Sequence, residues 1–319
     1  MRAGEEELAG CGSMFEPVMF EGGVHKHQLI IELVEDLGGY VLETNVMQTE
    51  INILMLIPEE DIPHMEQLAK KLLGKITVAP LAGTEIAVVA PSLSSQHLPH
   101  PSCDIAEFMR RQGANTNLIG LSRGVGKRVA VMNSYERELI NEHDLAIFVF
   151  GNFRACIQEK VSKLLSQIKV PVVAVGGPRI DEELPVEAYI DGFGRIAHRL
   201  RRKEEITQLE RVVGAVSRVL RRRREEMASD PLTVFPARAR FEIYSQIEEA
   251  RNILSPAPLT LQLDGIRVKL PYDEFADRIR AVRFEEGISL GEIAHIRRSK
   301  MKGYVLVKIK PSSETGMML

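Results

Sequence analysis

The sequence predicts an α/β (α+β) protein with an N-terminal ferredoxin-like unit, a central doubly wound α/β domain, and a C-terminal long helix followed by a small mixed unit. Two observations support this fold class. Strand and helix patterns follow the order βαββαβ ahead of residue 91, and two apolar runs, AIFVF and VVAVGG, lie farther along the 319-residue chain. Such runs are typical of parallel strands that helices cover on both faces.

Residues 14–91 carry the pattern of a ferredoxin-like domain, and residues 1–13 precede it as an acidic extension. A predicted strand over 14–22 leads into a helix whose apolar residues recur at helical spacing, and a Gly-Gly pair ends that helix. Two strands, a second helix and further strand pattern complete the order. Because this fold hosts many activities, the assignment predicts no chemistry.

Residues 92–195 change to the pattern of a doubly wound domain, in which helices alternate with buried strands. In open sheets of this kind, ligands bind beyond the carboxyl ends of the strands. The segments that follow those ends are residues 122–128, 151–156 and 176–179. We therefore expect the functional residues of this domain in these segments.

Residues 196–229 predict a long basic amphipathic helix with arginine-rich segments at both ends. Glutamates interleave with the arginines, and opposite charges at such spacing often only solvate a helix. A contact with the acidic face of a protein and a merely solvated helix both stay open. Residues 230–319 follow as a mixed unit, in which two alternating strand patterns meet at Asp264 and Gly265, a strong hairpin signal.

The composition argues against several classes of partner. The formal net charge of −3 is close to neutral, so the bulk electrostatics predict neither nucleic acid nor a membrane surface as a partner. No apolar run reaches the roughly 18 residues of a membrane span, and the acidic start lacks the order of a signal peptide. Tryptophan is absent, which argues against a stacking surface for bases. We therefore expect a cytoplasmic protein.

A glycine- and cation-rich turn, GLSRGVGKR at residues 120–128, suggests a phosphate-binding loop. That motif requires a glycine five positions before the glycine of its Gly-Lys pair, and a Ser or Thr after the lysine. A leucine and Arg128 occupy these two positions. The backbone around Gly124, with the side chains of Arg123 and Lys127, still forms a candidate anion contact. The alternative is a glycine-rich turn with solvated charges.

Cys103 and Cys156 are the candidate metal ligands. Both are expected near the start of a helix, where the helix dipole favours thiolate over thiol. Two thiolates at one rim of a sheet can bind a soft metal or an iron–sulfur cluster, but two ligands do not close a site. His97 and His100 are candidates for additional ligands, and a partner subunit is another source. The alternative is that both cysteines are small buried structural residues.

Several segments resemble the methanogenesis marker protein seven family of methanogenic archaea, over roughly residues 14–310. The most specific are HPSCDIAE, which contains Cys103, and GNFRAC, which ends at Cys156; EGGVHKHQLIIELVEDLGGYV and APLAGTEIAVVAP also match. The central part, at residues 84–178, is similar to the operon protein McrC of methyl-coenzyme M reductase as well. In the McrC proteins that it resembles, a histidine occupies the position of Cys156. Exchange between cysteine and histidine is typical of a metal ligand.

The resemblance implies a subunit of the machinery that reductively activates methyl-coenzyme M reductase, whose nickel tetrapyrrole must reach Ni(I). It implies the reductase, McrC, other marker proteins and an ATPase component as partners. It also implies an iron–sulfur cluster, shared with a partner subunit, for which Cys103 and Cys156 are ligands. The chain is then a non-catalytic subunit for electron transfer and scaffolding. The alternative is a stand-alone enzyme that binds a nucleotide or a phosphorylated ligand at residues 120–128.

Overall fold

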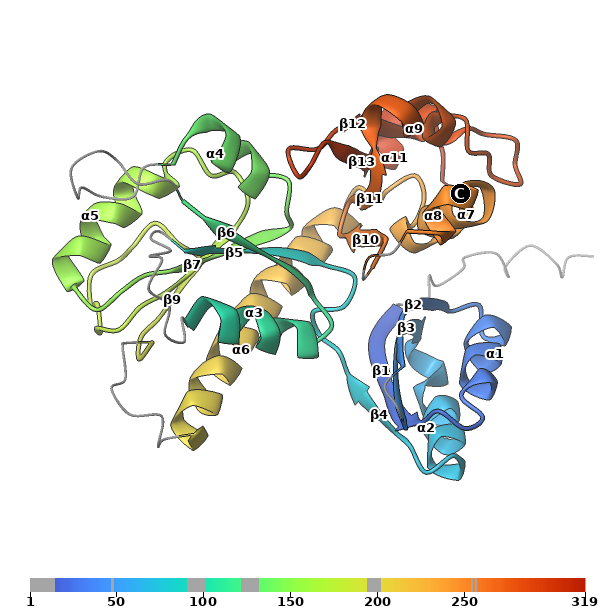
Figure 1. The fold of residues 1–319 in the computed structure, drawn as a ribbon, viewed down its shortest axis with the longest axis horizontal. Coiled ribbons are helices and arrows are strands. Elements are labelled where there is room, and N and C mark those ends of the chain that lie inside the picture. The colour runs from blue at the N-terminus through green and yellow to red at the C-terminus, as the bar shows by residue number, and fades with distance from the viewer. Residues whose placement is uncertain are drawn as a thin grey trace, which may run out of the picture. The chain divides into compact units, whose positions relative to one another are not determined.

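A computed structural model describes residues 15–46, 49–90, 101–121, 132–193, 202–253, 255 and 257–318. The chain divides into two compact units, the first ending at Ala82 and the second beginning at Gly83. Figure 1 draws the elements of both units as ribbons. Among the helices within the described ranges, none combines the length and the apolar character that crossing a membrane requires.

The first unit is a four-stranded antiparallel sheet with two helices. Its strand order, β2-β3-β1-β4, is that of the predicted ferredoxin-like fold. Alternate residues of the central strands, among them Phe20 and Met55, pack in one apolar cluster with Ile30 and Met65 of the helices. The elements are β1 (Phe15–Gly23), α1 (Gln28–Asp36), β2 (Tyr40–Val46), β3 (Glu50–Pro58), η1 (Glu59–Asp61), α2 (Ile62–Lys71) and β4 (Lys75–Val78).

The boundary predicted at residue 91 is wrong by one strand. Strand β5 (Glu85–Ala90) belongs to the second unit, where it pairs in parallel with β6 (Asn115–Gly120) and β7 (Leu145–Val149). All six residues of β5 are buried, as expected for a central strand covered on both faces. A strand pattern does not specify which sheet the strand joins, so residues 85–90 are predicted with the wrong unit.

The second unit contains the doubly wound domain as a five-stranded parallel sheet in the order β6-β5-β7-β8-β9. Helices α4 and α5 lie on one face of this sheet, and α3 and α6 lie on the other (Figure 1). The bounds are α3 (Pro101–Arg111), α4 (Ser134–Ile140), α5 (Arg154–Leu165), β8 (Val172–Val175), β9 (Ala188–Ile190) and α6 (Arg202–Ala228). Of the long helix predicted over 196–229, the structure describes residues 202–228 as α6.

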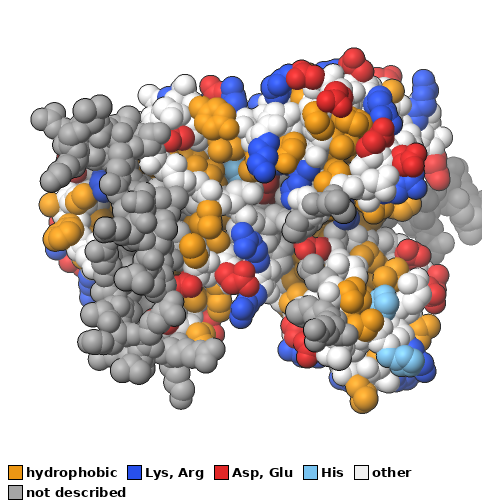
Figure 2. Space-filling model, in the orientation of Figure 1, with side chains coloured by type: hydrophobic (Ala, Val, Ile, Leu, Met, Phe, Trp, Pro, Cys, Tyr) orange, Lys and Arg blue, Asp and Glu red, His pale blue; other side chains and the backbone are white. Residues whose placement is uncertain are grey.

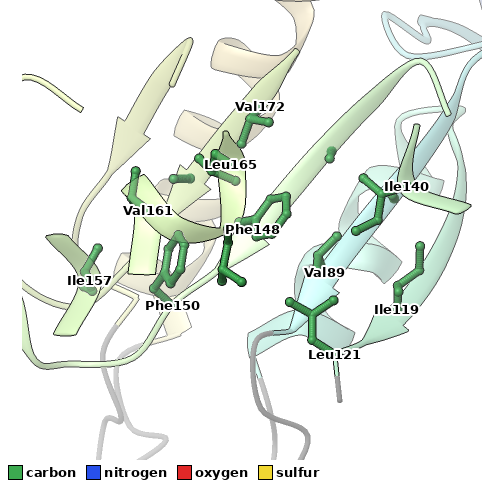
Figure 3. Packing of buried hydrophobic residues seen from close by; sticks show 14 residues of the cluster. Val89, Ile119, Leu121, Ile140, Phe148, Phe150, Ile157, Val161, Leu165 and Val172 are labelled. Carbon is green, nitrogen blue, oxygen red and sulfur yellow. The ribbon is translucent and has the colours of Figure 1, made fainter. Parts of the chain in front are cut away.

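An apolar core between the sheet and helices α4 and α5 fixes the position of α5 (Figure 3). Phe148 and Phe150 stack with their ring centroids 6.1 Å apart. Ile140 of α4 and Ile157 of α5 pack in the same cluster. Burial of one such large side chain contributes about 1.5–3 kcal/mol. The helix that carries Cys156 is therefore held rigidly against the sheet.

The C-terminal residues form an antiparallel sheet in the order β10-β11-β13-β12. Gln262 pairs with Gly265, which confirms the hairpin predicted at Asp264 and Gly265, and a Cβ at Gly265 would overlap the carbonyl oxygen of Val307. This sheet lies in the same compact unit as the parallel sheet, not in a separate one at 230–319. The elements are α7 (Pro236–Gln246), α8 (Glu248–Arg251), β10 (Leu259–Gln262), β11 (Gly265–Pro271), α9 (Tyr272–Arg280), α10 (Leu290–Ile293), β12 (Ala294–Arg298), β13 (Tyr304–Ile309) and α11 (Ser312–Thr315).

The surface carries mixed charge. On the face drawn in Figure 2, Lys and Arg side chains alternate with Asp and Glu side chains, in keeping with the near-neutral net charge of −3. On the basic helix α6, Arg222 contacts Glu187 with an Nη2–Oε2 distance of 2.7 Å, and Arg223 contacts Glu226 at 3.2 Å. The arginine-rich end of α6 is therefore partly neutralised by glutamates.

Candidate functional site

The carboxyl ends of the parallel strands lie at one side of the sheet, which we call its carboxyl edge; the amino edge is the opposite side. At the carboxyl edge, a topological switch point lies between β5 and β7. From β5 the chain passes through α3 to β6, and from β7 it passes through α5 to β8, on the other side of the sheet. Because crossovers between parallel strands are right-handed, the two helices leave the switch point on opposite faces. Open α/β sheets bind their ligands at such points.

Cys103 and Cys156 lie on the two helices that leave this switch point. Each is the third residue of its helix, α3 for Cys103 and α5 for Cys156. The side chain of Cys103 is exposed, that of Cys156 is partly buried, and both are free thiols. The structure thus places both thiols in a first helical turn, as the sequence predicts. That they ligate one cluster stays a prediction.

The other predicted site residues, His97, His100, Arg123, Gly124 and Lys127, lie outside the described residues. They belong to the segments that follow β5 and β6. Within the described ranges, no three His, Cys, Asp or Glu side chains are grouped so that they could hold a metal ion. A metal site built on the two cysteines therefore requires ligands from outside these ranges.

The segment that leads into α5 is accessible. Phe153, the residue before the helix, is 79% exposed. Arg154 contacts Glu182 with an Nη2–Oε2 distance of 2.6 Å, and the amide of Gly177 donates to the carbonyl of Gly151 at 3.1 Å. Exposed ion pairs contribute only about 0–1 kcal/mol each. These contacts connect the loops after β7 and β8.

The opposite, amino edge of the sheet carries a buried ionic network that sequence analysis missed. Arg267 of β11 is fully buried, and its Nε donates to Oε1 of Glu85 at 2.9 Å. Its Nη1 donates to Oε2 of Glu142 at 2.8 Å, and the hydroxyl of Ser299 donates to the same oxygen at 2.7 Å. One guanidinium group is therefore held between two carboxylates that come from distant parts of the chain.

The environment of Glu85 stabilises its ionised form. Burial alone raises the pKa of Glu85, but the charge of His143 in its protonated form, the charge of Arg267, and hydrogen bonds from Arg267 and Gln262 outweigh it, so the pKa lies below its ordinary value. The amide of Asn117 donates to Oε1 of Glu85 at 2.7 Å. Buried charges are tolerated when they are paired and hydrogen-bonded in this way.

His143 lies beside the network as a neutral imidazole. Its Nδ1 lies 2.9 Å from the carbonyl oxygen of Leu139, and its Nε2 lies 3.0 Å from Nδ2 of Asn117. Because a carbonyl oxygen accepts, Nδ1 carries the proton and Nε2 accepts from the amide of Asn117. Burial lowers the pKa of His143, which favours this uncharged form.

Asp144 connects the parallel sheet to the C-terminal hairpin. Its Oδ2 accepts from the amide of Glu85 at 2.8 Å, and its Oδ1 accepts from the amide of Leu263 at 2.9 Å. Burial raises the pKa of Asp144 to about 7, and the charge of Lys308 opposes that rise. His143 and Asp144 are adjacent in sequence but have different partners, so they form no acid–base pair with each other.

The network escaped sequence analysis because its members are far apart along the chain. Glu85 and Arg267 are separated by 182 positions, and no spacing rule connects them. The sequence contained only a weaker signal, a charged residue within each of two largely apolar strands. Glu85 opens a strand that is otherwise apolar, and Arg267 occupies a buried position of a strand, where an unpaired charge is costly. A charged residue at a buried strand position therefore predicts an unidentified partner of opposite charge.

Comparison with known proteins identifies the family. The family model of methyl-coenzyme M reductase operon protein C matches residues 15–282. The chain belongs to this family. Over 302 residues it is 49% identical to an uncharacterized protein of Methanocaldococcus jannaschii, covering 94% of this chain and 96% of that protein.

Relatives that carry the name of the operon protein C family match a shorter part of the chain. Identity to the methyl-coenzyme M reductase I operon protein C of Methanocaldococcus jannaschii is 30% over 117 residues, which is 34% of this chain and 58% of that protein. For the operon protein C of Methanosarcina barkeri it is 26% over 121 residues, 36% of this chain and 59% of that protein. The predicted similarity to McrC is thus confirmed. Both cysteines, Glu85, Glu142 and Arg267 lie within the range that the family model matches.

Proposed function

We propose that this protein is a methanogenesis marker protein seven, a subunit of the ATP-dependent complex that activates methyl-coenzyme M reductase. Its membership in the operon protein C family supports this proposal, as do the HPSCDIAE and GNFRAC segments. Its task is to hold an iron–sulfur cluster for electron delivery towards the nickel tetrapyrrole and to dock partner proteins. We place it in the cytoplasm, with neither nucleic acid nor a membrane as a partner.

The observation that carries the proposal is the position of Cys103 and Cys156. Both thiols lie in first helical turns, where the N-terminal end of a helix favours negative charge, and both helices leave one switch point. Thiolate sulfur is the donor that iron–sulfur clusters use most. The exposed side chain of Cys103 is accessible to a second protein. The residues present therefore fit a cluster held at the edge of the sheet.

The two thiolates leave the coordination of such a cluster incomplete. A four-iron cluster ordinarily takes about four protein ligands, and the described residues offer no third ligand beside the cysteines. We propose that a partner subunit supplies the missing ligands, with His97 and His100 as further candidates. A cluster bridged between subunits would be assembled only in the complex.

The chain's own residues position the two ligands. Helix α3 is anchored by the buried side chains of Ile105 and Met109, and α5 by those of Ile157 and Val161. Rigid helices hold their first turns more precisely than mobile loops do. A bound cluster would supply one-electron transfer, while the protein supplies position and docking surface. Since GLSRGVGKR departs from the phosphate-loop pattern, we assign ATP hydrolysis to a partner.

The cluster is tested by anaerobic co-expression with McrC, the other marker proteins and the ATPase component, followed by iron and sulfide analysis of the purified complex. We expect the Cys103→Ser, Cys156→Ser double variant to lose the iron of one cluster. The Cys11→Ser variant is the matched control, since it also removes a thiol, and it should retain that iron. If the double variant keeps all of its iron, the two cysteines are not ligands.

A separate experiment tests membership of the complex. Anaerobic pull-down with the parent protein, followed by mass spectrometry, should recover McrC and subunits of the reductase. Recovery of neither would contradict the proposal even if iron were present. A metal-free protein that binds ATP on its own would instead support a stand-alone enzyme that uses residues 120–128.

A further inference from the structure

A cavity of about 430 Å³ lies at the amino edge of the parallel sheet, within the second unit. The segments before β7 and β8, the end of α6 and the C-terminal sheet form its walls. This volume falls in the range of about 300–1,000 Å³ that small-molecule sites occupy. The Asp, Lys and Arg residues that line it are Asp144, Lys169, Arg223, Asp264, Arg297 and Lys308.

The cavity carries an excess of positive charge. Lys308 and Asp264 neutralise each other, with an Nζ–Oδ1 distance of 2.5 Å, and Arg223 contacts Glu226. Asp144 is partly protonated at neutral pH because burial raises its pKa to about 7. It therefore offsets less than one positive charge.

Two cations remain without compensation. Lys169 precedes β8 and Arg297 lies on β12, so they come from different walls of the cavity. Neither side chain forms an ion pair with any of the residues that the structure describes. Both side chains are solvent-exposed and line the same cavity, so an anion that enters it is attracted by two positive charges.

We propose that this cavity binds a small multiply charged anion, a phosphorylated or polycarboxylate compound, with Lys169 and Arg297 as its principal contacts. The guanidinium group of Arg297 matches two oxygens of one carboxylate or phosphate, and the ammonium group of Lys169 attracts a second negative charge. His295 and Lys308 face each other across β12 and β13 and add polar contacts on the same wall. The site lies at the opposite edge of the sheet from the cysteines and does not depend on the proposed function.

Isothermal titration calorimetry of the full chain with inorganic pyrophosphate and with citrate tests this site. Pyrophosphate represents phosphorylated ligands, and citrate represents polycarboxylates. We expect at least one of them to bind with one site per chain. The Lys169→Gln, Arg297→Gln double variant should weaken that binding at least tenfold, since it removes both unpaired cations (about 1.4 kcal/mol per factor of ten).

The Lys71→Gln, Arg298→Gln double variant is the matched control, because it removes the same charge outside the cavity and should change the affinity less than twofold. Thermal unfolding without anion establishes that each variant is folded, and the single Lys169→Gln variant replaces the double one if the latter is not. Absence of saturable binding of both anions at millimolar concentration overturns the proposal. An equal loss of affinity in the control overturns it as well, because it shows non-specific attraction.

Discussion

The two edges of the parallel sheet use polar groups in opposite ways. At the carboxyl edge Cys103 is exposed, and the ion pair of Arg154 with Glu182 faces solvent. At the amino edge Arg267 is fully buried between Glu85 and Glu142. The described groups of the first edge are accessible to solvent, while those of the second attach the C-terminal sheet to the parallel sheet. The two thiols and the residues that join the two sheets thus lie at opposite ends of the same parallel strands.

The buried ionic network at the amino edge explains why residues 83–319 form one compact unit. Arg267 and Gln262 come from the C-terminal hairpin, whereas Glu85 and Glu142 come from the parallel sheet. A buried ion pair is not by itself a source of stability, because desolvation offsets most of the attraction. Its larger effect is on specificity, since a misplaced hairpin would leave three charges buried without partners. Within the described ranges, the carboxyl edge contains no ion pair with both side chains buried.

The largest effect is expected when the buried network loses its cation. Arg267→Met leaves Glu85 and Glu142 as buried carboxylates without a counter-charge, and it should lower the free energy of unfolding by about 3–5 kcal/mol. Urea denaturation followed by circular dichroism measures this change. Arg154→Ala at the carboxyl edge is the control and should leave the free energy of unfolding nearly unchanged, because its ion pair with Glu182 is exposed to solvent. Equal losses in the two variants would remove the distinction between the edges.

A second test uses the pH dependence of stability. The pKa of Asp144 is about 7 in the folded protein and near 3.8 in the unfolded chain, so the folded state holds an additional proton between these values. The contribution of Asp144 to stability is therefore present at low pH and is lost as the pH rises from about 4 to about 7, by up to about 1.4 kcal/mol per pH unit.

Asp144→Asn removes this titration. The free energy of unfolding of the parent protein, relative to that of the variant, should decrease by about 2 kcal/mol between about pH 5 and about pH 7. Urea denaturation at intermediate pH values measures the difference. A difference that does not vary with pH would mean that Asp144 titrates in its ordinary range.

The sequence predicts local features well and long-range partners poorly. Apolar runs identify β7 and β8 as buried parallel strands, and the Asp264-Gly265 pair identifies the hairpin, because both signals are contained in a few residues. Glu85 was assigned to the wrong sheet, since strand pairing depends on residues far along the chain. The same limit hides the partnership of Glu85 with Arg267. The positions of the two cysteines were predictable because each is fixed by its own helix.

The smallest effect on the free energy of unfolding is expected from substitution of Cys103 and Cys156, the proposed cluster ligands. In protein purified alone and free of iron, the Cys103→Ser, Cys156→Ser double variant should unfold within about 0.5 kcal/mol of the parent, because one thiol is exposed and the other partly so. Urea denaturation under reducing conditions measures this difference. A loss above about 2 kcal/mol would show that Cys156 is a packing residue of α5, which is the alternative that the sequence left open. If the free energy of unfolding is unchanged and the complex loses iron, both sulfurs are cluster ligands. The cluster would then lie at the carboxyl edge, away from the residues that join the two sheets.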